Sequence, residues 1–280
     1  MNIKITADST CDLSAELVKK YGITIMPLTV IKNGEAFKDG VNITPGEIFA
    51  HVAAGGGLCS TTATNVGEYD EWFAKLSTQY DAVLHISLGS GFSSSYQNAC
   101  LAAEEYENIR VVDSQNLSTG QGLIVLKACE LAQQCEDLDA LYNNILEFVP
   151  KVESSFLLDQ LAYMVKGGRC SSVVALGANL LNLKPCIEVR DGKLTVVKKY
   201  RGDYAKCLAT YVKERLTNRD NLDLDTLFVT RTPVNDACLD AVKNAVKDCG
   251  SFKNIYWTEA GCTISCHCGP GTLGVLFLRK

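Results

Sequence analysis

The sequence has no apolar run long enough to cross a membrane and no excess of positive charge. Its longest apolar candidate, residues 173–183, is interrupted by Asn179 and Asn182 and falls short of the ~18–20 residues that a membrane span needs. The 280 residues carry 27 Lys and Arg against 32 Asp and Glu, a net charge of −5, which argues against a generic nucleic-acid-binding surface. Residues 1–6 run into a strand pattern without a signal peptide's apolar stretch, so we expect a cytoplasmic protein.

Four motifs of common catalytic sites are also missing. The chain has no G-x-x-x-x-G-K-[ST] phosphate loop, no H-E-x-x-H, no C-x-x-C and no G-x-S-x-G nucleophile elbow. One G-x-G-x-x-G match, at residues 269–274, is followed by only six residues. Because a dinucleotide site needs a helix and a later acidic residue after its glycines, we discount this match.

Cysteine, by contrast, is abundant. The 13 cysteines are odd in number and scattered, so we expect free thiols that behave as small hydrophobic side chains. Cys262, Cys266 and Cys268 gather around His267 near the end of the chain. Adjacent ligands at positions 266–268 fit tetrahedral metal coordination poorly, so no metal site is predicted there.

Strand and helix patterns alternate through the first half of the chain. Strands are predicted at residues 3–7, 23–31, 81–88 and 109–113, and helices at 14–21, 45–51, 66–76, 93–106 and 119–135. This rhythm indicates right-handed crossovers and a parallel sheet. Polar residues at the carboxyl ends of the strands, such as those at 8–10, 87–93 and 113–114, are then candidate functional residues.

The second half mixes hairpins with helices. Strands are predicted at 155–158, 227–230, 255–258 and 275–278, a hairpin at 187–200 around Asp191-Gly192, and helices at 161–165, 173–181, 204–216 and 237–246. We therefore expect an α/β protein of two domains. Residues 1–152 would form an α/β/α domain with a mainly parallel sheet, and residues 153–280 a two-layer α/β domain with a mixed sheet.

Two hydroxyl clusters have more than one interpretation. Ser60-Thr61-Thr62 follows a glycine-rich loop, and Ser93-Ser94-Ser95 lies where a buried strand leads into a helix. These side chains could serve only as helix N-caps, or they could converge with helix amides on a small anion. Likewise Arg169, after Gly167-Gly168, is either a surface residue of a turn or a guanidinium directed at an anion.

Several separated motifs together resemble the DegV family of bacterial fatty-acid-binding proteins. In order along the chain, the motifs are Asp8-Ser9-Thr10 with Asp12-Leu13, Thr61-Thr62, Ser90-Gly-Phe-Ser93 with Tyr96-Gln97, Asp113-Ser114 with Gly120 and Gly122, Gly167-Gly168-Arg169, and His267 with Gly269-Pro270-Gly271 and Gly274. The resemblance spans essentially the whole chain. It implies two α/β domains with a lipid headgroup between them, an acyl chain in a tunnel and no further cofactor.

The resemblance also implies which residues meet the lipid. The family's carboxylate contacts carry over to Thr62 and Ser93, with Thr61, Arg169 and His267 alongside. A fatty carboxylate is already ionised at neutral pH, so His267 is expected to orient the headgroup or stabilise its charge rather than accept a proton. Candidate tunnel residues, chosen as apolar positions in the sequence, are Phe92, Leu176, Leu180 and Leu183.

By resemblance, the protein is a carrier without catalytic residues of its own. It would present a long-chain fatty acid to a separate ATP-dependent fatty acid kinase, which forms an acyl-phosphate for phospholipid synthesis. The missing phosphate loop is consistent with this role. The expected partners are the fatty acid, the kinase and a transient membrane surface, and not nucleic acid.

Two alternatives to the carrier are kept. The first is a serine hydrolase or lipid transferase that uses Ser93 and His267, with Asp113 as the residue that orients the histidine. The second is a thiol or metal sensor built on Cys262, Cys266 and Cys268.

Overall fold

A parallel sheet organises the first half of the chain. The computed structural model describes residues 1–175 and 183–280. Its first sheet has the strand order β2-β1-β6-β7, with every neighbouring pair parallel. The four strands are β1 (Ile3–Asp8), β2 (Thr24–Met26), β6 (Ala82–Ser87) and β7 (Ile109–Asp113). The predicted parallel sheet is confirmed.

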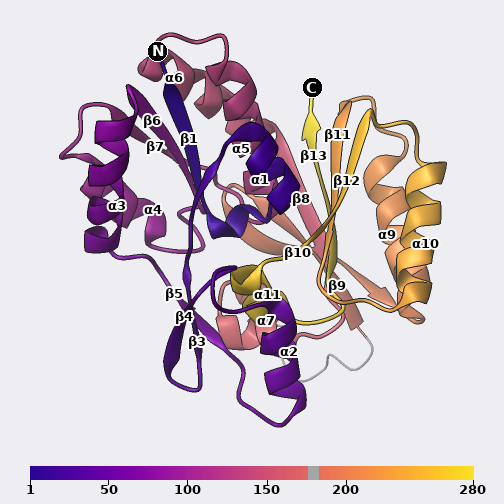
Figure 1. Ribbon diagram of the computed structural model, residues 1–280. Helices are drawn as coiled ribbons and strands as arrows, with labels where there is room; N and C mark the ends of the chain where they lie inside the picture. The colour runs from indigo at the N-terminus through magenta and orange to yellow at the C-terminus, as the bar shows by residue number, and fades with distance from the viewer. Residues whose placement is uncertain (176–182) are drawn as a thin grey trace.

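Helices cover both faces of this sheet (Figure 1). On one face, α3 (Val66–Gln79) and α4 (Ser95–Ala103) bury Tyr69, Phe73 and Ala99 against the strands. On the other face lie α1 (Ala15–Tyr21), α5 (Thr119–Ala132) and α6 (Leu138–Phe148). Both faces of β6 are therefore covered by helices, which explains its uninterrupted buried pattern.

A second, mixed sheet fills the other half of the chain. Its strand order is β10-β9-β8-β13-β11-β12. Of the described neighbouring pairs in this sheet, β11 and β12 are parallel and the other pairs are antiparallel. The strands are β8 (Val152–Leu157), β9 (Leu183–Arg190), β10 (Lys193–Arg201), β11 (Leu222–Arg231), β12 (Asn254–Glu259) and β13 (Leu273–Arg279). Helices α9 (Tyr204–Leu216) and α10 (Asp236–Asp248) pack on one face (Figure 1). The predicted two-domain α/β fold is confirmed.

The opposite face of the mixed sheet packs against the first domain. Phe228, Leu276 and Leu278 belong to the same buried cluster as the apolar side chains of α5. Nearer the β9–β10 end of the sheet, Phe156 and Leu194 join a cluster with Leu88 and Phe92 of the loop after β6. The two sheets thus share one apolar interface, and the candidate site lies within it. The boundary at residue 152 stays a prediction.

One predicted strand is wrong in its extent. Residues 23–31 form two strands in different sheets, because Pro27 has no N–H to donate to a continuous ladder. The chain leaves the parallel sheet after β2 and enters a small antiparallel sheet of β3 (Thr29–Lys32), β4 (Glu35–Lys38) and β5 (Ser60–Thr62). Helix α2 (Pro45–Ala53) lies between β4 and β5 in the chain.

Two helices, α6 and α11 (Cys262–Cys268), were not predicted. For α6 the sequence held a signal, because Asp137 caps the helix and Leu138, Leu141 and Ile145 repeat at helical spacing. For α11 the only signal in the sequence is Gly261 at the N-cap position. Glycine has no side chain that could accept from the first N–H groups of the helix. The remaining described helices are α7 (Ala162–Gly167), α8 (Ser171–Val174) and the short 3₁₀ turns η1 (Ser9–Cys11) and η2 (Val149–Lys151).

Asp8, at the end of β1, is the polar centre of the first domain. It is fully buried and accepts hydrogen bonds from Tyr69 Oη (2.7 Å), Ser87 Oγ (2.8 Å) and Leu88 N (2.7 Å). His85 Nε2 lies 3.3 Å from the carboxylate. Burial alone raises the pKa of Asp8, but His85 and these donors outweigh burial and lower it.

We predict that Asp8→Asn lowers the free energy of unfolding by about 2–4 kcal/mol, because the amide places a donor among donors. Since the folded pKa of Asp8 is depressed, its contribution is present above about pH 4, the unfolded value, and lost as pH falls further. Urea titration followed by circular dichroism measures both effects. Asp139→Asn, at an exposed ion pair with Arg110, is the control and should change stability by less than about 1 kcal/mol. Equal effects of the two substitutions would contradict the prediction.

Candidate functional site

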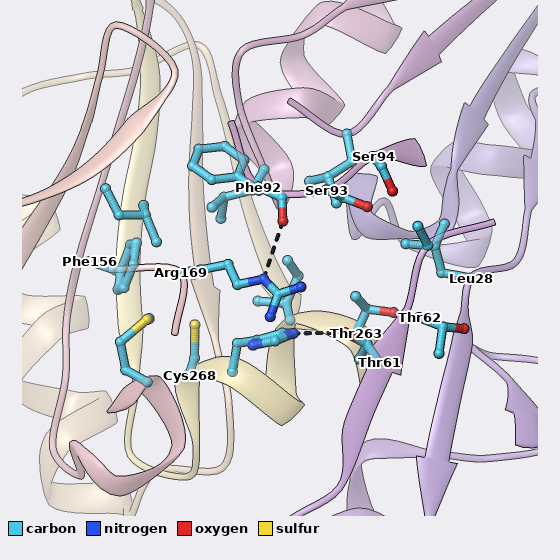
Figure 2. Close-up of a pocket in the computed structure, with 17 residues that line it drawn as sticks. Leu28, Thr61, Thr62, Phe92, Ser93, Ser94, Phe156, Arg169, Thr263 and Cys268 are labelled. Carbon is cyan, nitrogen blue, oxygen red and sulfur yellow. Dashed lines mark hydrogen bonds between the residues drawn. The ribbon is translucent and has the colours of Figure 1, made fainter. Parts of the chain in front are cut away.

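A cavity of about 180 Å³ lies in the interface between the two domains (Figure 2). Its apolar walls come from both domains and are Leu28, Ala63, Leu88, Phe92, Leu117, Phe156, Met164, Leu194, Ile264 and Cys268. Its polar lining residues are Thr61, Thr62, Ser93, Ser94, Arg169, Thr263 and His267. A concave, mostly apolar space with a few convergent polar groups is typical of a small-molecule site.

All five residues predicted to bind a carboxylate line this one cavity. Thr61 and Thr62 come from β5, Ser93 from the loop before α4, Arg169 from the turn after α7, and His267 from α11. Of the predicted tunnel residues, Phe92 lines the cavity, whereas Leu183, half-buried at the start of β9, is not among its described lining residues. Leu176 and Leu180 lie outside the described residues.

His267 is within hydrogen-bond distance of Thr61 in the lining of the cavity. Its Nε2 lies 2.8 Å from Thr61 Oγ1. Burial, together with the nearby Arg169 guanidinium, lowers the pKa of His267 to about 4, so the imidazole is neutral at pH 7. A neutral ring does not act as a cation toward an anion, and it can still donate one hydrogen bond.

Glycine is needed at both positions before Arg169, and the steric reason differs between the two. A Cβ at Gly167 would lie 2.3 Å from His267 Nδ1, so only glycine lets the ring approach α7. Gly168 adopts the left-handed conformation (φ +67°) that closes α7. Together they place Arg169 beside His267 in the lining of the cavity.

Arg169 links the two sides of the cavity. Its Nη1 donates to Gly167 O (2.7 Å), and its Nε lies 3.4 Å from Phe92 O, the contact drawn in Figure 2. Phe92 immediately precedes Ser93, so the guanidinium reaches from the second domain to the serine loop of the first. Much of the arginine stays exposed, which leaves donors free for an anion.

Ser93 makes hydrogen bonds at the start of a helix and also lines the cavity. Its Oγ accepts from Ser95 N (3.1 Å) and lies 3.0 Å from Ser95 Oγ, so it supports the start of α4. It also lines the cavity. The neighbouring Ser94 occupies the N-cap position but makes no capping hydrogen bond through its side chain.

The hydrolase arrangement is not assembled. His267 Nε2 faces Thr61 rather than Ser93, and Asp113 accepts from Ser90 N (3.0 Å) and Gln115 N (2.8 Å). No hydrogen bond therefore connects the three residues of a Ser93–His267–Asp113 relay in the described structure.

The clustered cysteines do not form a metal centre either. Cys262 and Cys266 pack with Val30, Ile43 and Ile48, whereas Cys268 packs on the cavity side with Phe92 and Phe156. Burial raises the pKa of all three thiols, that of Cys268 to about 12. Within residues 1–175 and 183–280, no three His, Cys, Asp or Glu side chains are grouped to hold a metal.

Helix α11, which carries His267, is held by two aspartate side chains from the first domain. Asp39 accepts from Cys262 N (2.8 Å) and Thr263 N (2.9 Å), and Asp12 accepts from Gly261 N (2.8 Å). Ser118 Oγ also donates to Asp12, at 2.6 Å. Burial raises the pKa of Asp12 to about 8. Sequence reasoning missed both roles, because the capping residues lie more than 200 positions from the helix that they cap.

The described helices are all too short or too polar to traverse a lipid bilayer.

Comparison with known proteins gives one consistent family. The family model described as "Uncharacterised protein, DegV family" matches residues 2–280. A DegV domain-containing protein of Caldanaerobacter subterraneus subsp. tengcongensis is 31% identical over 282 residues, which cover 99% of each chain. A second, from Clostridium acetobutylicum, is 30% identical over 282 residues with the same coverage.

Solved structures of the same family superpose over the whole chain. A DegV family protein of Thermus thermophilus, reported for its fatty acid binding, is 26% identical with a TM-score of 0.89 and full coverage of both chains. A DegV lipid-binding protein of Thermotoga maritima is 25% identical with a TM-score of 0.84, again with full coverage.

We predict that His267 titrates near pH 4 and not near its ordinary 6.5. Its folded pKa lies below the unfolded value, so it contributes stability above about pH 6.5 that is lost as pH falls toward 4. Nitrogen-15 NMR of the imidazole measures the midpoint, and His267→Gln should remove this part of the pH dependence of stability. A midpoint above pH 6 would show that the ring is more hydrated than the structure indicates.

We also predict that Asp39→Ala lowers the free energy of unfolding by about 2–3 kcal/mol, because two buried N–H groups of α11 lose their acceptor. The matched control is Asp203→Ala, which removes the exposed cap of α9 and should cost only about 1 kcal/mol. Urea unfolding compares the two variants, and a control at least as damaging as Asp39→Ala would refute the role of Asp39.

Proposed function

The chain belongs to the DegV family, and from this premise we propose that it is a fatty-acid-binding protein that presents its ligand to a kinase. The acid's carboxylate would lie among Thr61, Thr62, Ser93, Arg169 and His267, and its chain along the apolar walls of the cavity. The single observation that carries the proposal is the meeting of these five polar side chains, from four segments of the chain, in one mostly apolar cavity.

The polar lining suits a carboxylate. A fatty acid headgroup has a pKa near ~4–5 and is ionised at neutral pH, so it needs donors and not a base. Arg169 supplies the positive charge, and the short hydroxyls of Thr62 and Ser93 can donate to the carboxylate oxygens. His267, neutral and bonded to Thr61, would fix the position of that threonine.

The apolar lining would supply most of the affinity. Each buried methylene contributes roughly 0.8 kcal/mol, so about fourteen methylenes give on the order of 11 kcal/mol before the costs of association. Phe92, Phe156, Met164 and Leu194 offer such surface from both domains. The relative from Thermus thermophilus, whose structure was reported for fatty acid binding, supports this ligand class.

The kinase part of the proposal comes from the family resemblance, and the chemistry that the described residues lack is consistent with it. The sequence has no phosphate loop, and the described residues assemble no Ser93–His267–Asp113 relay. A carrier of this kind acts in the cytoplasm, where a partner enzyme holds ATP and a membrane surface offers or receives the lipid. We propose residues 1–152 and 153–280 as its two domains, with the headgroup between them.

Native mass spectrometry of the purified protein, followed by lipid analysis after denaturation, tests the proposal. We expect one fatty acid per chain. The double variant Thr62→Val/Ser93→Ala should retain less fatty acid, with affinity weaker by about 2 kcal/mol, because each change removes one donor to an anion. Ser90→Ala is the control, since Ser90 lies on the same loop but donates to Asp113 outside the cavity.

A protein that stays ligand-free after incubation with a panel of fatty acids would contradict the proposal. Unchanged retention by the double variant, with wild-type loading intact, would move the carboxylate to another part of the protein.

A further inference from the structure

The two threonines of β5 lie on opposite faces of the small antiparallel sheet. Thr61 pairs with Val30 of β3 on the face that packs on α11, where its hydroxyl meets His267. Side chains alternate along a strand, so Thr62 lies on the other face. Strand β5 is the edge of this sheet nearest to α11, and both threonines line the interdomain cavity (Figure 1). A charge on the Thr62 face therefore belongs to the surroundings of a carboxylate bound there.

Lys38 occupies the same face as Thr62, two strands away. In the strand register, Thr29 of β3 lies directly opposite Thr62 of β5 and also directly opposite Lys38 of β4. The three side chains therefore form one row across the sheet on a single face. The Lys38 side chain leans along this row toward β5, because its Nζ donates to Thr29 Oγ1 at 3.0 Å.

This contact brings a positive charge close to Thr62. Directly opposite residues of antiparallel strands have Cβ atoms about 4.5–5.5 Å apart. Since the Lys38 Nζ is 3.0 Å from the Thr29 hydroxyl, the charge lies within roughly 8 Å of the Thr62 side chain. Ionic screening at physiological salt acts over about the same length, so a charge at this separation is only partly screened. Lys38 itself does not line the cavity.

The Lys38 ammonium keeps one donor for an anion. Of its three N–H groups, one goes to Thr29 and one to Glu68 Oε1 at 2.6 Å in the described structure. Glu68 is fixed at the start of α3, because its other carboxylate oxygen accepts from Asn65 N and Nδ2. The Lys38 side chain is 36% exposed, so its third donor is open to solvent or to an anion.

We infer that Lys38 is a positioning residue of the site, which supplies a second positive charge beside Thr62 and makes the cavity select an ionised fatty acid over an uncharged lipid; this inference rests on the proposed function. Arg169 is the one cation among the described residues that line the cavity, since His267 is neutral at pH 7. A carboxylate that moves from water to this site loses solvation, and a nearby ammonium offsets part of that loss. An uncharged headgroup gains little from the same charge.

The test compares hexadecanoic acid with hexadecan-1-ol by calorimetry on delipidated full-length protein at pH 7.5 and low salt. Lys38→Met keeps the length of the side chain and removes its charge, so binding of the acid should weaken about threefold to fivefold. Binding of the alcohol should stay within about 1.5-fold of wild type. High salt should reduce the effect on the acid, because exposed charges are screened. Lys38→Arg should restore binding of the acid, and Lys38→Gln replaces the methionine variant if that variant fails to fold.

A second variant at the same ion pair should act in the opposite direction. Glu68→Gln removes the negative partner of Lys38, while the amide oxygen can still accept from Asn65 N at the start of α3. Binding of the acid should therefore strengthen about threefold. Lys198→Met is the matched control, because Lys198 makes an ion pair of the same length (2.6 Å) with Glu214 of α9, on the face of the mixed sheet away from the first domain. It should leave binding of the acid unchanged.

An equal loss of acid and alcohol binding in Lys38→Met would overturn this inference, because the lysine would then only hold the strands together. Unchanged binding of the acid, with Thr62→Val/Ser93→Ala weakened, would overturn it as well and leave the proposed function standing. Weaker binding of the acid in Glu68→Gln would show that the ion pair matters as a structural contact and not through its charge, which also overturns the inference. If wild-type protein binds no fatty acid, the proposed function itself fails.

Discussion

The candidate site depends on aspartate side chains of one domain that accept from the first N–H groups of a helix in the other. Asp39 and Asp12 meet α11 at its start, where three backbone donors have no partner within the helix. Burial disfavours the charged form of Asp12 more than its hydrogen bonds favour it, so the pKa of Asp12 rises to about 8 and the side chain is largely a neutral carboxylic acid at pH 7. Asp39 meets two N–H groups at the helix start, which carry the positive end of the helix dipole.

This contact decides where the cavity residues of α11 lie. Thr263, His267 and Cys268 all face the interface from one short helix of seven residues. So short a helix has little stability of its own, because few intrahelical hydrogen bonds repay its nucleation. Its geometry therefore follows from the capping aspartates, from the Thr61–His267 contact and from the missing Cβ of Gly167.

The residues after β1 hold the site without lining the cavity. Asp8 accepts from Tyr69 of α3 and from Ser87 and Leu88 at the end of β6, Thr10 donates to Gln121 of α5, and Ser9 donates to Asp39 at 3.1 Å. Because ligands bind at the carboxyl ends of parallel strands, the polar residues 8–10 were candidate functional residues from the sequence. Here the same position serves to join β1, α5 and α11, and the polar residues that line the cavity come from β5, the loop after β6, the turn after α7 and α11 itself.

The sequence by itself determined the α/β fold, the parallel and mixed sheets and the identity of five polar side chains that share the cavity. Periodicity and the turn residues around Asp191 act locally, so they can be read without knowing the fold. Only the tertiary structure decided that Pro27 divides one predicted strand between two sheets, and that α11 exists where no local cap indicates a helix. It also decided that His267 is neutral and pairs with Thr61. The physical reason is that burial and capping depend on contacts between residues such as Asp39 and Cys262, which are neighbours only after the chain has folded.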